Sequence, residues 1–276
     1  MSKSIREPAV AGMFYPANPS ELSGMINGFL REVKAHTEHP KAIIVPHAGY
    51  IYSGPVAAYA YAQLLPLRDR IRRVVLLGPS HRVSLRGIAA STADYFSTPL
   101  GQIPIDHAAI ESILECPQVD YHDNAHAMEH SLEVHLPFLQ SVLSSFALVP
   151  LVVGETAPRH VAEVLQALWG GDETLVVIST DLSHYHSYKE AKGLDSATSQ
   201  AIEHLEFSRI GGEDACGCYP LNGLLYLARA EHLNITTLDL RSSGDTAGPR
   251  EEVVGYGAYV VTEPHDGGSK GQRQSQ

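Results

Sequence analysis

The chain has 276 residues, and its 20 Lys and Arg against 31 Asp and Glu give a formal net charge of −11. This balance argues against nucleic acid as the main partner, because a duplex binder needs a basic face that displaces counterions from phosphates. No apolar run approaches the roughly 20 residues that a membrane-spanning helix requires, and no signal-peptide core follows the N-terminal charges, so no membrane partner is expected.

Short β-branched runs alternate along the chain with longer amphipathic stretches, which is typical of an α/β domain. Strands are predicted, in chain order, over 41–47, 72–81, 146–154, 173–184, 235–241 and 252–261. Helices are predicted over about 18–33, 54–65, 106–115, 128–143, 158–169, 188–205 and 219–231. The segment 91–104 is predicted to be a loop or a small hairpin.

Four of the predicted strands are almost entirely apolar, over 43–45, 74–77, 151–153 and 175–178. Strands of this kind are covered on both faces, which predicts a doubly wound, mostly parallel sheet flanked by helices. The run 254–261 alternates with glycines and is predicted to be an edge strand. A single domain is expected over 1–262, followed by a polar, Gly-rich and disordered tail over 263–276.

The numbers of cysteine and histidine residues indicate the redox setting of the protein and the kind of functional site to expect. Three cysteines do not form a disulfide framework, which indicates a reducing, cytoplasmic setting. The pair Cys216 and Cys218 lacks a second cysteine pair and is interpreted as small buried residues at a helix start. By contrast, 15 His against 6 Phe exceed what packing requires, and imidazole is the commonest protein metal ligand and a proton carrier near neutral pH.

Three predicted strands are each followed by a short loop with a histidine close to the end of the strand. These histidines are His47, His81 and His184. Ligands of open parallel sheets bind outside the carboxyl ends of the strands, so these imidazoles are expected to converge. A fourth strand ends in SSGDT and presents Asp245. Two His and one carboxylate form the facial triad of non-haem Fe(II) enzymes, with the third His as acid or base. The alternative is that each His only caps its strand.

A second cluster lies in HAMEHSLEVHLPFL, over 126–139, which we predict to be one helix that ends at Pro137. Residues four apart share a helix face, so His130 with His126, or Glu129 with Glu133, can line the pocket. His130 and Glu129 are therefore candidate catalytic residues. The alternative is that the leucines pack on the core and the polar side is solvated. The spacing is not that of an HExxH zinc protease.

Taken together, seven motifs resemble the Memo family, the B component of the AmmeMemoRadiSam system, over Arg6 to Val261. The resemblance implies a fold similar to class III extradiol (LigB-type) dioxygenases. By motif, His47 and His81 match the metal-binding histidines, and His184 matches the pocket His that acts as acid or base in extradiol enzymes. Eukaryotic members carry a Cys after the penultimate strand, where this chain has Asp245. The motifs are REPAVAGMFYP, VPHAGYIYSG, LLGPSH, EHSLEVHLPFL, VVISTDLSHY, DACG and VVGYGAY.

Three functions follow from this resemblance. The first is an Fe(II) enzyme related to the extradiol dioxygenases, in which His184 moves a proton and Asp181 or Glu129 orients it. The second is a hydrolase that uses Zn²⁺ at the same site. The third is a non-catalytic partner of a radical SAM enzyme that binds a small molecule or a peptide. Copper, proposed for eukaryotic relatives, is a further candidate ion.

Overall fold

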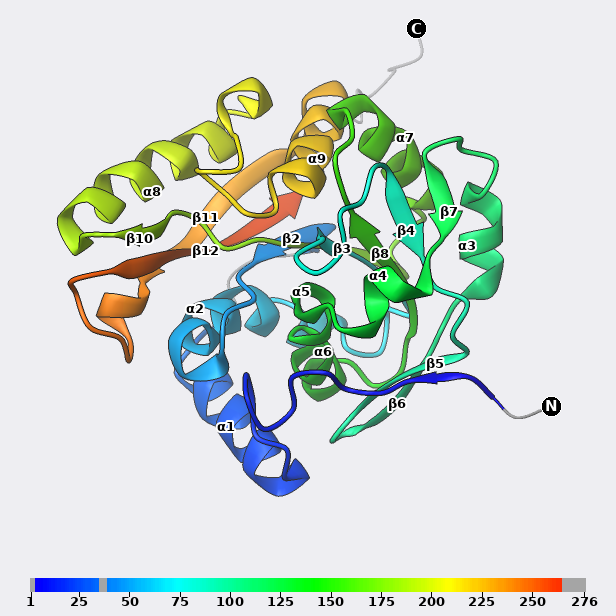
Figure 1. The fold of residues 1–276 in the computed structure, drawn as a ribbon, viewed down its shortest axis with the longest axis horizontal. Coiled ribbons are helices and arrows are strands. Elements are labelled where there is room, and N and C mark those ends of the chain that lie inside the picture. The colour runs from blue at the N-terminus through cyan, green and yellow to red at the C-terminus, as the bar shows by residue number, and fades with distance from the viewer. Residues whose placement is uncertain (1–2, 35–38, 265–276) are drawn as a thin grey trace, which may run out of the picture.

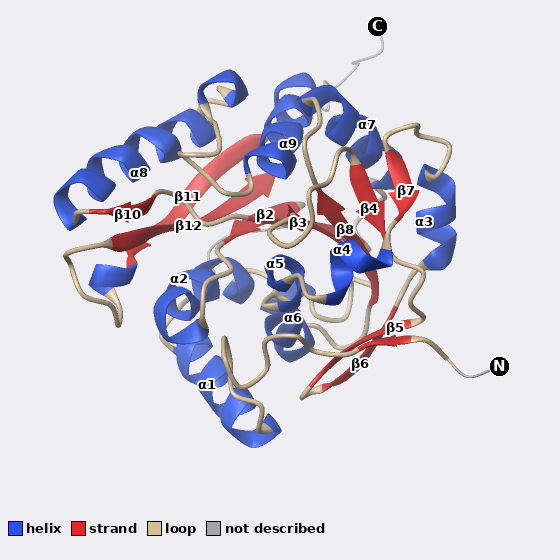
Figure 2. Ribbon diagram, in the orientation of Figure 1, coloured by secondary structure: helices blue, strands red, loops and turns tan. Residues whose placement is uncertain are grey.

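The computed structural model describes residues 3–34 and 39–264. Within them, a nine-stranded sheet forms the central layer, and a separate three-stranded sheet lies beside it (Figure 1). Figure 2 shows α7, α8 and α9 along one side of the large sheet and α1, α2, α5 and α6 along the other. The predicted α/β class with a mostly parallel sheet flanked by helices is confirmed.

The large sheet has the order β10-β12-β2-β9-β3-β8-β4-β7, with β11 paired to β12. Its centre, β2-β9-β3-β8, is parallel throughout, and its residues are almost all buried. The six predicted strands are all present. The strands are β2 (Ala42–Val45), β3 (Arg73–Pro79), β4 (Ile88–Ala90), β7 (Val119–Tyr121), β8 (Ala147–Val153), β9 (Thr174–Ser179), β10 (His184–His186), β11 (Asn234–Ser242) and β12 (Val253–Thr262).

The helices cover both faces of this sheet. Helix α2 packs on β2 and β12, α8 packs on β11 and β12, and α9 packs on β3 and β9. The helices are α1 (Pro19–Arg31), α2 (Tyr50–Ala62), α3 (His107–Ile113), α4 (Asp123–Ala127), α5 (His130–Glu133), α6 (Leu136–Val142), α7 (Pro158–Leu168), α8 (Tyr188–Glu203) and α9 (Cys218–Ala230). Short 3-10 turns span Leu65–Leu67, Phe207–Arg209 and Ser243–Asp245.

Helix α1 shows how sequence fixes a local element. The Asn18 side chain accepts hydrogen bonds from the backbone of Ser20 and Glu21, which caps the first turn. Leu22, Ile26 and Leu30 then form one buried stripe against α2 and α6. Each such side chain contributes about 1.5–3 kcal/mol when it leaves water.

The three-stranded sheet confirms the hairpin predicted within 91–104. Strands β5 (Tyr95–Thr98) and β6 (Gly101–Pro104) pair antiparallel, and β1 (Ile5–Arg6) adds to β5 in parallel. The N-terminal segment is thereby attached to the body of the domain. The segment that follows β1 carries Phe14 toward the carboxyl edge of the large sheet, where it lines a cleft.

The prediction of an edge strand over 254–261 is wrong, because β12 lies between β2 and β11. The glycines of β12 are explained by the close packing of neighbouring groups. A Cβ atom at Gly255 would overlap the Asp195 carboxylate from α8, and one at Gly257 would overlap the Tyr259 ring. The alternation therefore reflects the approach of neighbouring groups rather than an exposed edge.

The single helix predicted over 128–143 is also wrong, because the segment forms two short helices, α5 and α6. Pro137 lies in the first turn of α6 instead of ending a helix. Proline is tolerated there because first-turn N–H groups have no helical partner. His126 lies on a separate helix, α4, so the expected pairing of residues four apart does not apply to His126 and His130.

Strand β12 ends at Thr262, and the predicted disordered tail over 263–276 lies outside the described residues apart from Glu263 and Pro264. In the described part of the chain, every helix is too short or too polar to cross a bilayer.

Candidate metal centre

A cleft of about 610 Å³ opens at the carboxyl ends of the central strands. His47 follows β2, His81 follows β3, and His184 begins β10 shortly after β9. Because β2, β9 and β3 are adjacent and parallel, their ends meet at one edge and deliver the three histidines together. His130, Asp181 and Cys216 also line this cleft. The sequence-predicted convergence of the three histidines is therefore observed.

Three side chains in the cleft could hold a metal ion. Ligand atoms of His47, His81 and Cys216 all lie within 4.8 Å of one another. The Cys216 Sγ is 3.4 Å from His47 Nε2. Gly217 makes this placement possible, because its N–H donates to Thr180 Oγ1 at 2.9 Å and a Cβ there would overlap the Ser179 carbonyl.

Reasoning from the sequence missed Cys216, which was interpreted as a packing residue. The available signal was the DACG motif, which carried part of the family resemblance without a role. Burial raises the pKa of the Cys216 thiol to about 12, with a further contribution from the Asp181 carboxylate. The group is therefore a thiol unless a cation replaces its proton.

His47 is held on two sides. Its backbone N–H donates to Asp181 Oδ1 at 2.7 Å, and its Nδ1 lies 2.6 Å from Ser179 Oγ. The ring therefore turns Nε2 toward Cys216 and the cleft. Burial, followed by the neighbouring histidines, holds the pKa of His47 well below its usual range. The ring is consequently neutral, which is the form that binds metals.

His81 is oriented by Glu129, the N-cap residue of α5. The two Glu129 oxygens bind the His81 backbone N–H at 2.6 Å and its Nδ1 at 2.9 Å. Burial alone would raise the pKa of Glu129, but hydrogen bonds from His81 and Ser131 outweigh it and lower the pKa to about 2. An ionised carboxylate thus fixes the ring and leaves Nε2 for a ligand. Glu129 acts on His81, whereas the sequence suggested His184.

His130 forms a wall of the cleft. Its ring stacks on His81, with centroids 4.7 Å apart, and contacts Phe14 at 4.8 Å between centroids. Burial, together with the nearby His81, lowers the pKa of His130 to about 4. His81, Glu129 and His130 also form a second group of possible ligands, which shares His81 with the first.

Asp181 and His184 complete the polar lining. Asp181 Oδ2 lies 3.9 Å from His47 Nε2, and burial raises the pKa of this carboxyl group. His184 lines the cleft beside Tyr185, which is 72% exposed and has a φ of 61°. A left-handed backbone at a bulky residue stores strain on the order of 1–3 kcal/mol, and such residues often cluster at functional sites.

The structure does not bring Asp245 into this cleft. Its carboxylate accepts hydrogen bonds from the Tyr188 hydroxyl and from the backbone and side chain of Ser242. Strand β11, which leads to Asp245, is separated from β2 by β12, a distance of about 10 Å at the usual strand spacing. Beside the two histidines, the third possible ligand in this group is therefore the Cys216 thiol.

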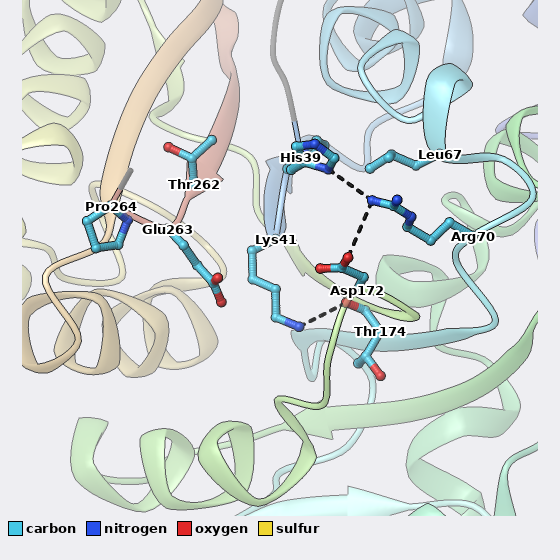
Figure 3. A pocket seen from close by; sticks show the side chains of 10 residues that line it. His39, Lys41, Leu67, Arg70, Asp172, Thr174, Thr262, Glu263 and Pro264 are labelled. Carbon is cyan, nitrogen blue, oxygen red and sulfur yellow. Dashed lines mark hydrogen bonds and ion pairs between the residues drawn. The ribbon is translucent and has the colours of Figure 1, made fainter. Parts of the chain in front are cut away.

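A smaller pocket of about 290 Å³ lies at the opposite edge of the sheet (Figure 3). Burial lowers the pKa of its Lys41, whose Nζ donates to four backbone carbonyls, including that of Trp169 at 2.7 Å. Arg70 pairs with Asp172 at 3.3 Å. These cations hold neighbouring elements together, and the pocket lacks the converging ligands of the carboxyl edge.

Comparisons with known proteins agree with one another. A family model described as "Memo-like protein" matches residues 6–260. A MEMO1 family protein of Aquifex aeolicus is 37% identical over 91% of this chain and 97% of its own length. A MEMO1 family protein of Thermotoga neapolitana is 34% identical over 94% of this chain and 100% of its own length. The crystal structure of uncharacterized protein JW3007 from Escherichia coli K12 has a TM-score of 0.51 at 14% identity, covering 79% of this chain and 99% of that one. This last likeness concerns the fold alone.

Proposed function

The chain belongs to the Memo family, and on this premise we propose that it is a metal-dependent redox enzyme, with Fe(II) as the first candidate ion. The observation that carries the proposal is the meeting of His47, His81 and Cys216 within 4.8 Å in an open cleft. Two imidazoles and a thiol on one side of the cleft leave the other side for a substrate.

The donor set fits a transition metal. Imidazole suits iron, copper and zinc, and a thiolate favours the softer ions among them. The thiol has a raised pKa, but coordination replaces its proton with the cation. The Glu129 carboxylate behind His81 is the partner that metal-bound histidines usually have. When bound, a redox-active ion supplies Lewis acidity and electron-transfer chemistry to the substrate.

His184 is the proposed proton carrier. It lines the cleft but lies outside the group of three donors, so its ring is available to a substrate. Imidazole is the side chain that exchanges protons most readily near neutral pH. Asp181 supports the same task, because its buried carboxyl group has a raised pKa and faces His47. Phe14 and Tyr185 border the substrate space.

Elemental analysis of protein purified without oxygen or chelators tests the proposal. We expect near-stoichiometric iron in the wild type and its loss in His81→Ala and Cys216→Ser, with circular dichroism unchanged. Cys116→Ser removes a half-buried thiol elsewhere and is expected to keep the metal. Full metal content in both site variants would refute the site. If the purified protein contains iron, oxygen-uptake assays with catechols are the next experiment.

A zinc-dependent hydrolase is the second candidate, and the thiol is the observation that favours it. Two His and one Cys also suit Zn²⁺, whose bound water ionises near pH 7. Zinc in the purified protein, with turnover in the absence of oxygen, would support this function over the first. A wild type that neither contains nor takes up metal would point to a binding role for the cleft, with a small molecule or peptide as ligand.

A further inference from the structure

A buried hydrogen-bond chain runs from His47 away from the cleft and into the core. The Ser179 hydroxyl oxygen, at the end of β9, lies close to three groups. These are His47 Nδ1 at 2.6 Å, His135 Nε2 at 2.8 Å and the Ser131 carbonyl oxygen at 2.7 Å. All four residues are at most 2% exposed, so water does not compete for these bonds.

The positions of the hydrogens follow from what each atom can do. A carbonyl oxygen only accepts, whereas a serine hydroxyl has one hydrogen and two lone pairs. The Ser179 hydrogen therefore goes to the Ser131 carbonyl. Both ring nitrogens must then donate to the remaining lone pairs of Ser179. Any other arrangement sets two lone pairs against each other, either at the Ser131 carbonyl or at one of the ring nitrogens, which costs about as much as a lost buried hydrogen bond.

The far end of this hydrogen-bond chain, at His135 and Tyr61, provides an independent check on the hydrogen positions. If His135 carries its hydrogen on Nε2, its Nδ1 must accept. The Tyr61 hydroxyl lies 2.8 Å from that nitrogen. Tyr61 is fully buried, and burial holds its pKa well above the usual range, so it is protonated and able to donate. Each donor and acceptor along the chain is thus matched, with no buried group left over.

We infer that Ser179 is a positioning residue, which fixes His47 as the Nδ1–H tautomer and presents the Nε2 lone pair to the cleft. The Ser131 carbonyl directs the Ser179 hydroxyl, and His135 with Tyr61 occupies its other lone pair. Cys216 Sγ, 3.4 Å from His47 Nε2, is placed to donate its thiol hydrogen to that lone pair. The inference rests on the proposed function for the identity of the ligand, but the tautomer belongs to the metal-free protein.

The two metal-facing histidines are therefore oriented in different ways. His81 donates to an ionised carboxylate, which increases the basicity of its ring. His47 donates to a neutral hydroxyl, which fixes the ring without adding charge. Of the two rings, only His81 therefore has a carboxylate at its Nδ1, whereas the Asp181 carboxyl group accepts from the His47 backbone N–H and lies 3.9 Å from His47 Nε2. Such a difference tunes the affinity for a divalent ion.

Nuclear magnetic resonance of metal-free protein labelled with ¹⁵N-histidine tests the tautomer directly. His47→Gln identifies the His47 signals by their disappearance. We expect wild-type His47 to show a protonated Nδ1 and an unprotonated Nε2. Ser179→Ala is expected to give a mixture of tautomers, and Ser179→Thr, which keeps the hydroxyl, to restore the wild-type pattern. Ser183→Ala, at a buried serine of the loop that follows β9, is the matched control and should change nothing.

Competition titration with Zn²⁺ as the probe adds a second readout. We expect Ser179→Ala to bind Zn²⁺ about 10- to 100-fold more weakly than wild type, as is usual when a residue behind a metal ligand is lost. Ser179→Thr should retain most of the affinity. An Ala variant with unchanged tautomer and unchanged affinity would overturn the positioning role.

The two proposals can fail separately. A wild-type His47 that carries its hydrogen on Nε2 overturns the inference, whether or not the protein binds metal. A wild type with the expected tautomer but no affinity for Zn²⁺ or Fe(II) refutes the proposed function and leaves the inference standing. Should Ser179→Ala fail to fold, the wild-type spectrum and the Thr variant still decide the outcome.

Discussion

Individual residues behind the cleft determine how its donors are held. Glu129 is 1% exposed, yet its pKa is about 2, because His81 and Ser131 donate to it. A buried charge of this kind is tolerated only when its hydrogen bonds are complete. The carboxylate therefore has one main task, which is to keep the His81 ring in place.

Replacing Glu129 tests this task. Glu129→Gln keeps the shape but removes the charge, and we expect metal affinity to fall about 10- to 100-fold. Stability should fall as well, because the amide oxygen replaces only one of the two acceptors and the amide nitrogen then faces an N–H group of His81. Competition titration and thermal unfolding measure the two effects. Glu155→Gln, which alters an exposed pair with Arg86, is the control. Equal metal affinity in the Glu129 and Glu155 variants would show that the carboxylate does not support His81.

Among the elements, α5 connects the N-terminal segment to the cleft. Its Glu133 is fully buried and accepts from the backbone of Ala9 and Val10, from the Tyr15 hydroxyl, and from Arg6. Glu133 thus fixes the segment that places Phe14 against His130. The element is short, with few backbone bonds of its own, so it depends on these contacts.

Removing Glu133 leaves the buried Arg6 without its charge partner. We expect Glu133→Ala to lower the free energy of unfolding by about 3–5 kcal/mol, the usual effect of breaking a buried ion pair. The double variant with Arg6→Met should lose less than the two single effects combined. Urea unfolding of the four proteins in the cycle measures the coupling. A loss below 1 kcal/mol, as for an exposed pair, would contradict the assignment.

The secondary-structure elements also show which features of the fold could be predicted from sequence patterns alone. The central strands were predictable because Ile43, Leu76 and Val177 belong to unbroken apolar runs that only a covered sheet accommodates. The break between α5 and α6 could not be predicted, since a proline in the first turn of a helix and a proline that ends a helix look alike in sequence without tertiary contacts. Cys216 was missed for a related reason, because its role depends on meeting His47, 169 residues away.

One glycine of β12 and one of α8 offer a matched pair of substitutions. Gly255→Ala would force a Cβ into the Asp195 carboxylate, and we expect a loss of about 1–3 kcal/mol in the free energy of unfolding. Gly193→Ala, in α8 with open space around it, should add about 0.5–1 kcal/mol by restricting the unfolded chain and favouring the helix. Urea unfolding of both variants checks the opposite signs. A tolerated Gly255→Ala would show that close packing against Asp195 is not the reason for a glycine at this position.

For the whole molecule, folding brings several histidines into the interior in neutral form. Burial lowers the pKa of His126 to about 4 and that of His135 to about 3. His126 donates from Nε2 to the Ala89 carbonyl, and His135 belongs to the chain behind the cleft. These buried, neutral rings make the fold sensitive to acid, because unfolding lets them take up protons.

The sign and range of that sensitivity follow from His126. Its pKa is about 6.5 in an unfolded chain and about 4 in the fold, so both states are neutral at pH 7. As the pH falls from 6.5 to 4, only the unfolded state binds the proton, and the fold loses up to about 3 kcal/mol from this residue. His126→Gln, which can still donate to Ala89, should flatten the fall in unfolding free energy across this range. The exposed His204→Gln is the control. If urea unfolding at pH 7 and pH 4.5 gave the same difference for His126→Gln as for wild type, His126 would have to be protonated in the fold.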